Sequence, residues 1–327
     1  MTPLPSQLEA FHERLIELLG AETAAAVLAS MARPKRCGYW RNPLRAGPAA
    51  EDQPGEPVAG LPGCRSLAAP MRARLVASAE AESGAIYPMN PSSLLAPLLL
   101  APQAGQEVLD LAAAPGGKTL VLAALMRNTG RIAAVDPVPA RFHRMRANLE
   151  RCGVSIAECY GHDGRSVGRK VPGRFDAVLL DAPCSSEARM RLDDPDSYRH
   201  WRPRKVRETA RKQRGLIRSA FAALKPGGRL LYCTCAFAPE ENEAVVDYLL
   251  RNEPEAELLD LHADVQALLG GEGRIDATWT PRLMAGIRVW QGQQFAGSLA
   301  RTLRVLPDSL WDGFYLALLR RGPSVDR

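Results

Sequence analysis

Two cysteines of this sequence, Cys184 and Cys235, each follow an apolar segment that is typical of a buried strand. The segments read FDAVLLDAPC and RLLYCTC, and 51 residues separate the two cysteines (235 − 184 = 51). In open α/β sheets the ends of neighbouring strands meet at one edge, so both thiols could lie in one cleft. A thiolate there could add to carbon 6 of a cytosine ring, which would activate carbon 5 for methyl transfer.

Asp181 stands three residues before Cys184 and could assist this addition by hydrogen bonding to ring nitrogen 3. Completion of the reaction requires loss of the carbon 5 proton and departure of the thiol, so two sulfurs could divide the chemistry. Four other cysteines are interpreted as buried small hydrophobes: Cys37, Cys64, Cys152 and Cys159. Cys233 and Cys235 lie close together without a second pair at zinc spacing, so no metal site is expected.

A tight turn after the strand EVLDL predicts a binding site for a polar ligand. Its small residues allow the backbone and the start of the helix LVLAALM to approach that ligand. Asp136 ends the next strand, 26 residues after Asp110 (136 − 110 = 26), near the spacing at which an acid meets ribose hydroxyls. Asp163 in GHDG could accept from an adenine amino group, or it could only form a turn beside Gly164. The turn consists of Ala112, Ala113, Ala114, Pro115, Gly116, Gly117 and Lys118.

A phosphate-binding loop is the alternative interpretation of this turn, because Gly117, Lys118 and Thr119 resemble the end of that motif. The motif requires a glycine five positions before its second glycine, where this chain has Ala112. A nucleoside-triphosphate site is therefore the weaker hypothesis.

Strands that alternate with helices from Gln106 onward predict a parallel sheet. Residues 8–32 have helical spacing and precede a loop rich in Pro and Gly, which predicts a small, mostly helical N-terminal region. The 327 residues, 46% of them hydrophobic, can fill a proper core. No apolar stretch is long enough to span a membrane and the start lacks the order of a signal peptide, so we expect a cytoplasmic protein without membrane contact.

A net charge of +6 suits a polyanionic partner, and the distribution of charge is more informative than the total. The segment from Arg189 to Arg218 is dense in Arg and Lys and also holds Tyr198, His200 and Trp201. This combination could bind RNA, with charges for phosphates and rings for bases. A solvated helix face, with the Trp in the core, explains the pattern equally well.

Four segments in family order give the chain a close resemblance to the Sun-type family of RNA cytosine-5 methyltransferases, which includes bacterial ribosomal RNA enzymes and the eukaryotic Nop/Sun proteins. Ala112 stands where the family often has Cys, Ser186 where Gly is common and Ala236 where Ser or Thr is usual; none of these changes removes a catalytic group. The segments are DLAAAPGGKT (110–119), DAPCSS (181–186), LKPGGRLLYCTCAFAPEENEAVV (224–246) and VLPDSLWDGFYLALL (305–319).

The resemblance implies a class I methyltransferase fold, Rossmann-like, with a mostly parallel seven-stranded sheet over residues 84–327 and an accessory RNA-binding region at 1–83. It implies Cys235 as the nucleophile and Cys184 as the residue that assists breakdown of the adduct. It also implies S-adenosylmethionine as cofactor. The methionine part would lie on the turn 112–118, the ribose on Asp136 and the adenine on Asp163.

The resemblance assigns the remaining site residues as well. It implies that Asp181 contacts the cytosine edge and borders the cofactor, and that Lys118 lies near the target base. Arg141 is expected beside the cofactor, and Asn90 and Ser92 are expected to shape the floor of the cleft.

The expected partner is RNA, with ribosomal RNA favoured over transfer RNA, and the expected state is a monomer. Two other classes stay open: a non-catalytic RNA-binding assembly factor and, from the Pro-Cys pair of Cys184 alone, a DNA cytosine enzyme. The second cysteine, Cys235, and the PEENE stretch after it favour RNA.

Overall fold

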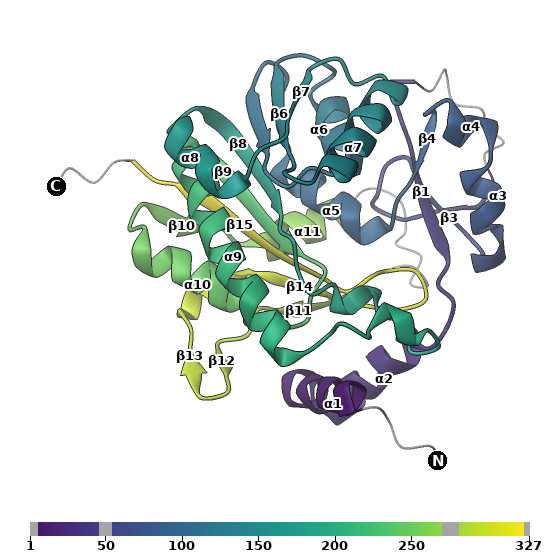
Figure 1. Ribbon diagram of the computed structural model, residues 1–327, viewed down its shortest axis with the longest axis vertical. Helices are drawn as coiled ribbons and strands as arrows, with labels where there is room; N and C mark the ends of the chain where they lie inside the picture. The colour runs from purple at the N-terminus through teal and green to yellow at the C-terminus, as the bar shows by residue number, and fades with distance from the viewer. Residues whose placement is uncertain (1–5, 46–53, 270–280, 324–327) are drawn as a thin grey trace.

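The computed structural model describes residues 6–45, 54–269 and 281–323, and a nine-stranded sheet forms the centre of this part of the chain (Figure 1). The strand order is β11-β14-β15-β9-β8-β5-β6-β7, and β10 pairs with β15. The pairs β9-β8, β8-β5, β5-β6 and β6-β7 are parallel, whereas β15 is antiparallel to β9. The strands are β5 (Glu107–Asp110), β6 (Arg131–Val135), β7 (Ala157–Tyr160), β8 (Phe175–Asp181), β9 (Leu224–Thr234), β10 (Ala256–Leu258), β11 (Arg282–Ala285), β14 (Leu303–Leu306) and β15 (Phe314–Arg321).

The predicted class I fold is confirmed, but its sheet has nine described strands where seven were expected. The short outer strands β10 and β11, of three and four residues, were not expected from the sequence. Strand β11 lies at the open edge with its residues largely exposed, so its sequence lacks the apolar alternation by which strands are recognised.

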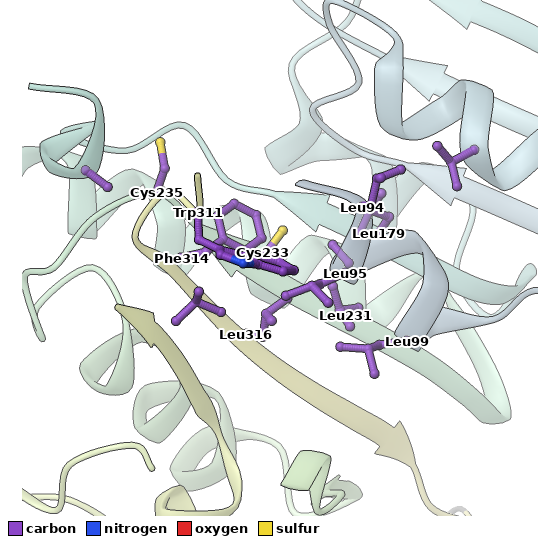
Figure 2. Packing of buried hydrophobic residues seen from close by; sticks show 14 of the residues in the cluster. Leu94, Leu95, Leu99, Leu179, Leu231, Cys233, Cys235, Trp311, Phe314 and Leu316 are labelled. Carbon is purple, nitrogen blue, oxygen red and sulfur yellow. The ribbon is translucent and has the colours of Figure 1, made fainter. Parts of the chain in front are cut away.

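Successive side chains of the central strands point to opposite faces of the sheet and belong to two separate hydrophobic clusters, one on each face. Leu179 of β8 and Leu231 of β9 belong to the first cluster, with α5. Figure 2 shows them opposite Leu94, Leu95 and Leu99, with Cys233 beside Trp311 in the same cluster. The neighbouring residues Leu180 and Leu230 belong to the second cluster, with α9 and α10.

The helices lie on both faces of this sheet (Figure 1). Helices α5, α6, α7 and α11 contribute to the first cluster, and α8, α9 and α10 contribute to the second. The bounds are α5 (Pro91–Leu100), α6 (Gly117–Leu125), α7 (Pro139–Arg151), α8 (Val167–Lys170), α9 (Pro203–Ala222), α10 (Glu243–Asn252) and α11 (Leu261–Leu269), with a small hairpin of β12 (Val289–Trp290) and β13 (Gln293–Gln294).

The N-terminal region is less helical than predicted. The expected helix is divided at Gly20, whose φ of +75° breaks it into α1 and α2, and a four-stranded antiparallel sheet in the order β2-β3-β1-β4 follows. Strand β4 pairs with β1 although it lies beyond the predicted boundary at residue 83, so the small sheet uses residues from both sides of it. The elements are α1 (Ser6–Leu19), α2 (Ala21–Met31), β1 (Cys37–Arg41), β2 (Glu56–Pro57), β3 (Cys64–Leu67), α3 (Arg72–Val76), α4 (Ala79–Glu82) and β4 (Ile86–Pro88).

The carboxyl ends of the parallel strands converge as the sequence predicts. Strands β5 and β8 end at Asp110 and Asp181, and Asp136 and Cys235 directly follow β6 and β9. No helix in the described part of the chain is long and apolar enough to cross a membrane.

Candidate active site

The thiols of Cys184 and Cys235 lie 3.4 Å apart, sulfur to sulfur. Two backbone hydrogen bonds hold the segments that carry them: Ala182 N–H donates to the carbonyl of Cys233 (2.9 Å), and Ala188 N–H donates to that of Cys235 (3.0 Å). Both cysteines are free; Cys235 is buried and Cys184 is partly exposed. The predicted meeting of the two sulfurs in one place is therefore observed.

The two thiols have opposite pKa shifts. A hydrogen bond from Cys184, stronger than the opposing effect of burial, lowers the pKa of Cys235 to about 7, and the positive charge of Arg189 contributes to the decrease. The same hydrogen bond, together with burial, raises the pKa of Cys184 well above its ordinary value. These shifts favour the proton on Cys184 and bring the ionisation of Cys235 close to neutral pH.

Arg189 is a site residue that the sequence analysis placed only within the basic segment. It ends the short η3 helix (Glu187–Arg189), which the bond from Ala188 holds against Cys235. The nearby Cys235 thiolate raises the pKa of Arg189, and no carboxylate of the described residues lies within salt-bridge distance of its guanidinium. Its only signal in the sequence was its position five residues after Cys184.

Lys118 is engaged by an acid of the site rather than by either cysteine. Its ammonium group forms an ion pair of 2.7 Å with Asp181 and lies 5.5 Å from the ring centroid of Phe314. Burial is the largest single effect on the pKa of Lys118 and lowers it, but the charge of Asp181, its hydrogen bond and the charge of Cys233 together make the net shift upward. The Cys233 thiol donates to the other oxygen of Asp181 at 3.6 Å, so this carboxylate is held from both sides.

Buried acids fix the loops that follow the two cysteines. Glu187 accepts from the backbone N–H groups of Phe237 and Ala238, both at 2.7 Å. Glu241 accepts from the N–H of Ser185 at 2.9 Å and is also bonded to its hydroxyl, and burial raises the pKa of Glu241 to about 9. In the sequence Glu241 stands within one family segment and Glu187 directly follows another, and nothing in their spacing indicates their partners.

The cofactor turn has the shape that a closely approaching ligand requires. Gly116 has φ +101°, and a Cβ on Gly117 would lie 2.6 Å from Met89 and 2.7 Å from Tyr87, so larger residues do not fit. Asp110 is buried at the start of this turn, and its Oδ1 has no hydrogen-bond partner among the described residues. A buried free acceptor beside a cradle of alanines and glycines fits the amino acid part of S-adenosylmethionine.

Two residues predicted to contact the cofactor, Asp136 and Arg141, are linked to this turn. The carboxylate of Asp136 is buried and pairs with Arg141 at 3.1 Å, and Arg141 also donates to the carbonyl of Ala114 at 3.0 Å. Asp163 is exposed, caps the next short helix through the N–H of Arg165 and pairs with that residue's guanidinium. The turn-forming role of Asp163 is thus observed, and its contact with adenine stays a prediction.

The phosphate-loop alternative is disfavoured by the geometry of its last two residues. The hydroxyl of Thr119 is buried and donates to Asp110 at 2.7 Å, and Lys118 is engaged by Asp181. Neither side chain is free for a triphosphate or its magnesium ion. Among the described residues, no group of three or more His, Cys, Asp or Glu could hold a metal ion.

Asn90 and Ser92 form hydrogen bonds to the segment 308–313, which borders the site. Asn90 donates to the carbonyl of Leu310 at 2.9 Å, and the hydroxyl of Ser92 donates to that of Asp312 at 2.8 Å. They thereby fix the residues just before Phe314, whose ring faces Lys118.

The basic segment divides into a core part and a surface part. Trp201, expected as a possible base-stacking residue, is buried and donates to Glu187 at 2.8 Å, and Tyr198 is also buried. For these rings the correct interpretation is the one in which the helix face is solvated and the Trp lies in the core. The exposed basic side chains of α9 include Lys205, Arg207, Arg211 and Lys212.

Together, the mixed sheet with helices on both faces, the cradle after β5 and the acid after β6 define a class I methyltransferase, whose cofactor is S-adenosylmethionine. Residues 97–320 match the model of the family described as 16S rRNA methyltransferase RsmB/F, and the chain belongs to this family. The family predicted from the sequence motifs is thereby confirmed.

Individual relatives support this assignment. The chain is 47% identical over 184 residues to ribosomal RNA small subunit methyltransferase F of Escherichia coli, covering 56% of this chain and 38% of the relative, so the match spans well under half of that protein. A methyltransferase homolog protein from Pyrococcus horikoshii is 28% identical, with a TM-score of 0.76, covering 98% of this chain and 100% of that one. NSun6 from Pyrococcus horikoshii, solved with SFG, has the same fold at 20% identity, with a TM-score of 0.69 over 98% of this chain and 99% of that chain.

The position of Arg189 generates a test of how the thiolate is stabilised. In Arg189→Met the pKa of Cys235 should rise by about one unit, because a nearby positive charge is lost. The rate of Cys235 alkylation by iodoacetamide, followed by peptide mass spectrometry across pH 5.5–9.5, should have its midpoint displaced upward from about 7.

Arg191→Met is the matched control, since Arg191 is exposed and pairs with Asp193 rather than with the cysteines. An unchanged midpoint in Arg189→Met, or an equal change in the control, would exclude Arg189 as the stabilising charge.

Proposed function

We propose that this protein methylates carbon 5 of a cytosine in ribosomal RNA, with Cys235 as the covalent nucleophile and Cys184 assisting release. The observation that carries the proposal is the pair of thiols 3.4 Å apart with opposite pKa shifts. A single buried cysteine would be a weak nucleophile, whereas this pair supplies a thiolate at neutral pH.

In the addition step the Cys235 thiolate donates its electron pair to carbon 6 of the cytosine, and a bond forms between sulfur and carbon. The negative charge moves through the ring toward nitrogen 3. Asp181, held in an ion pair with Lys118, would accept a hydrogen bond from the amino group beside nitrogen 3, and the Lys118 ammonium would balance the added negative charge. Carbon 5 becomes nucleophilic as a result.

S-adenosylmethionine, held by the turn 112–118 and Asp136, would supply the electrophilic methyl group. In the release step the proton on carbon 5 passes to water, the double bond between carbons 5 and 6 forms again, and the sulfur of Cys235 departs as a thiolate. The Cys184 thiol, whose sulfur lies 3.4 Å from that of Cys235, would donate a hydrogen bond to this departing thiolate. The hydrogen bond that lowers the pKa of Cys235 therefore also makes it a better leaving group.

These different roles predict that replacement of Cys184 and replacement of Cys235 have different effects on the reaction. With RNA and S-adenosylmethionine, Cys184→Ala should accumulate a protein–RNA band that resists denaturing gel electrophoresis. Cys235→Ala and the double variant should give neither band nor product. Cys159→Ser, which changes a cysteine away from the pair, should behave as the parent protein. A band in Cys235→Ala and none in Cys184→Ala would reverse the two roles.

Ribosomal RNA is the proposed substrate because the family description and the Escherichia coli relatives both name it. Bisulfite sequencing of total RNA from a deletion strain should show loss of methylation at one or a few cytosines of small-subunit RNA. The site should be restored by the parent gene and not by Cys235→Ala. Loss confined to transfer RNA would assign the same chemistry to the other RNA class.

The exposed face of α9 is proposed as part of the RNA path. Lys205, Arg211 and Lys212 are exposed, and no carboxylate of the described residues lies within salt-bridge distance of them. Arg204, in contrast, pairs with Glu208 at 3.0 Å. Unpaired surface cations are the ones that can replace the counterions of a phosphate backbone.

Replacement of Lys205, Arg211 and Lys212 by Ala should weaken RNA binding and flatten its dependence on salt. Each lost phosphate contact should reduce the log–log slope by about 0.7, so the three should reduce it by about 2. Fluorescence anisotropy from 50 to 300 mM salt measures the slope. An unchanged slope would make this helix face a solvated surface only.

A further inference from the structure

Helix α1 precedes the residues that match the family model, yet it contacts the loop that follows the nucleophile (residues 236–242, here the nucleophile loop). The guanidinium of Arg14 makes two hydrogen bonds to Glu240 of this loop, at 2.9 and 2.7 Å. The side chains of this pair are only 15% and 21% exposed. The pair is thus better shielded than the surface ion pairs whose contribution is small.

A second contact from α1 reaches the same loop through aromatic rings. Phe11 packs edge-on against Trp201, with ring centroids 5.4 Å apart, and lies 6.4 Å from Phe237 of the nucleophile loop. Trp201 in turn donates to Glu187, which accepts from the backbone of Phe237 and Ala238. One buried acid therefore joins the helix to the loop.

The nucleophile loop is hydrogen-bonded to residues adjacent to both cysteines. Glu240 is held by α1, and the next residue, Glu241, is bonded to Ser185, the neighbour of Cys184. Asn242 is bonded to Thr234 and donates to the carbonyl of Ala236, the residues on either side of Cys235. A displacement of the loop would therefore change the distance between the two sulfurs.

We propose that α1 is a positioning element for Cys235, acting through Arg14 and Phe11 on the nucleophile loop. The proposal uses the proposed function only for the role of Cys235 as nucleophile. It assigns a part in the reaction to a helix outside the family-defining region.

Loss of the Arg14 ion pair alone should leave the helix docked. Leu8, Phe11 and Leu15 of α1 are buried in the first cluster, and Glu17 accepts from Gln291 of the β12–β13 hairpin. Substitution of Arg14 therefore tests positioning without removing the hydrophobic contacts that fold the region.

The test compares Arg14→Met with the charge-reversed double variant Arg14→Glu/Glu240→Arg. In Arg14→Met the sulfurs should separate, the pKa of Cys235 should rise by about half to one unit, and alkylation of Cys235 at pH 7 should slow by about two- to fivefold. The double variant should recover most of the parent rate because it restores the ion pair. Arg14→Glu alone should be the slowest of the series.

Arg321→Met is the matched control, because Arg321 at the far end of β15 forms an ion pair with Glu255 at 2.9 Å whose side chains are 22% and 24% exposed. Its alkylation rate should equal that of the parent, while its thermal midpoint should fall about as much as that of Arg14→Met. Equal alkylation rates in Arg14→Met and the parent would overturn the proposal. A slower rate without recovery in the double variant would also overturn it, since the effect would then not depend on the ion pair.

Alkylation requires no RNA, so this result is independent of the substrate. If Arg14→Met slows alkylation but no variant methylates RNA, the positioning role stands and the proposed function fails. If methylation occurs and alkylation is unaffected by Arg14, the proposed function stands and the role of α1 fails.

Discussion

The parallel pairing of β8 with β9 is the interaction on which the site depends. Its register places Asp181 opposite Cys233 and lets Ala182 bond to the carbonyl of Cys233, so the two loops leave the sheet side by side. Side chains on one face of these strands fill the core under α5, and those on the other face fill the core under α9. A slip by one residue would exchange the two faces, bury the wrong groups and separate the cysteines.

At the site, a hydrogen bond and a positive charge lower the pKa of Cys235 and so oppose the effect of burial. A thiol in an apolar setting resists ionisation, and Cys64, whose pKa burial raises to about 12, shows the ordinary outcome. Cys235 is nearly as inaccessible but has a hydrogen-bond donor in Cys184 and a cation in Arg189. Burial raises the pKa of the neighbouring acid Glu241 to about 9, which limits the negative charge near the thiolate.

Much of this arrangement could be predicted from the sequence. Apolar strands alternate with helices, and acids and cysteines stand at the strand ends. These are local patterns in the sequence, and the parallel topology brings the strand ends together. Arg189, Glu187 and Glu241 could not be identified in this way, because their roles come from contacts across 40 or more residues of chain, as between Glu187 and Phe237. Trp201 shows the opposite problem: its position among arginines suggested a surface role, whereas its indole is held by a buried acid.

The turn from Glu240 to Glu243 has a consequence for how this chain can change in length. Its four successive residues contact four different bodies: helix α1, the loop of Cys184, the end of β9 and, through Arg304, strand β14. An insertion or deletion of one residue here would rotate every later side chain away from its partner at once. The spacing of these residues is therefore fixed, so natural or engineered variation in loop size has to occur elsewhere in the molecule.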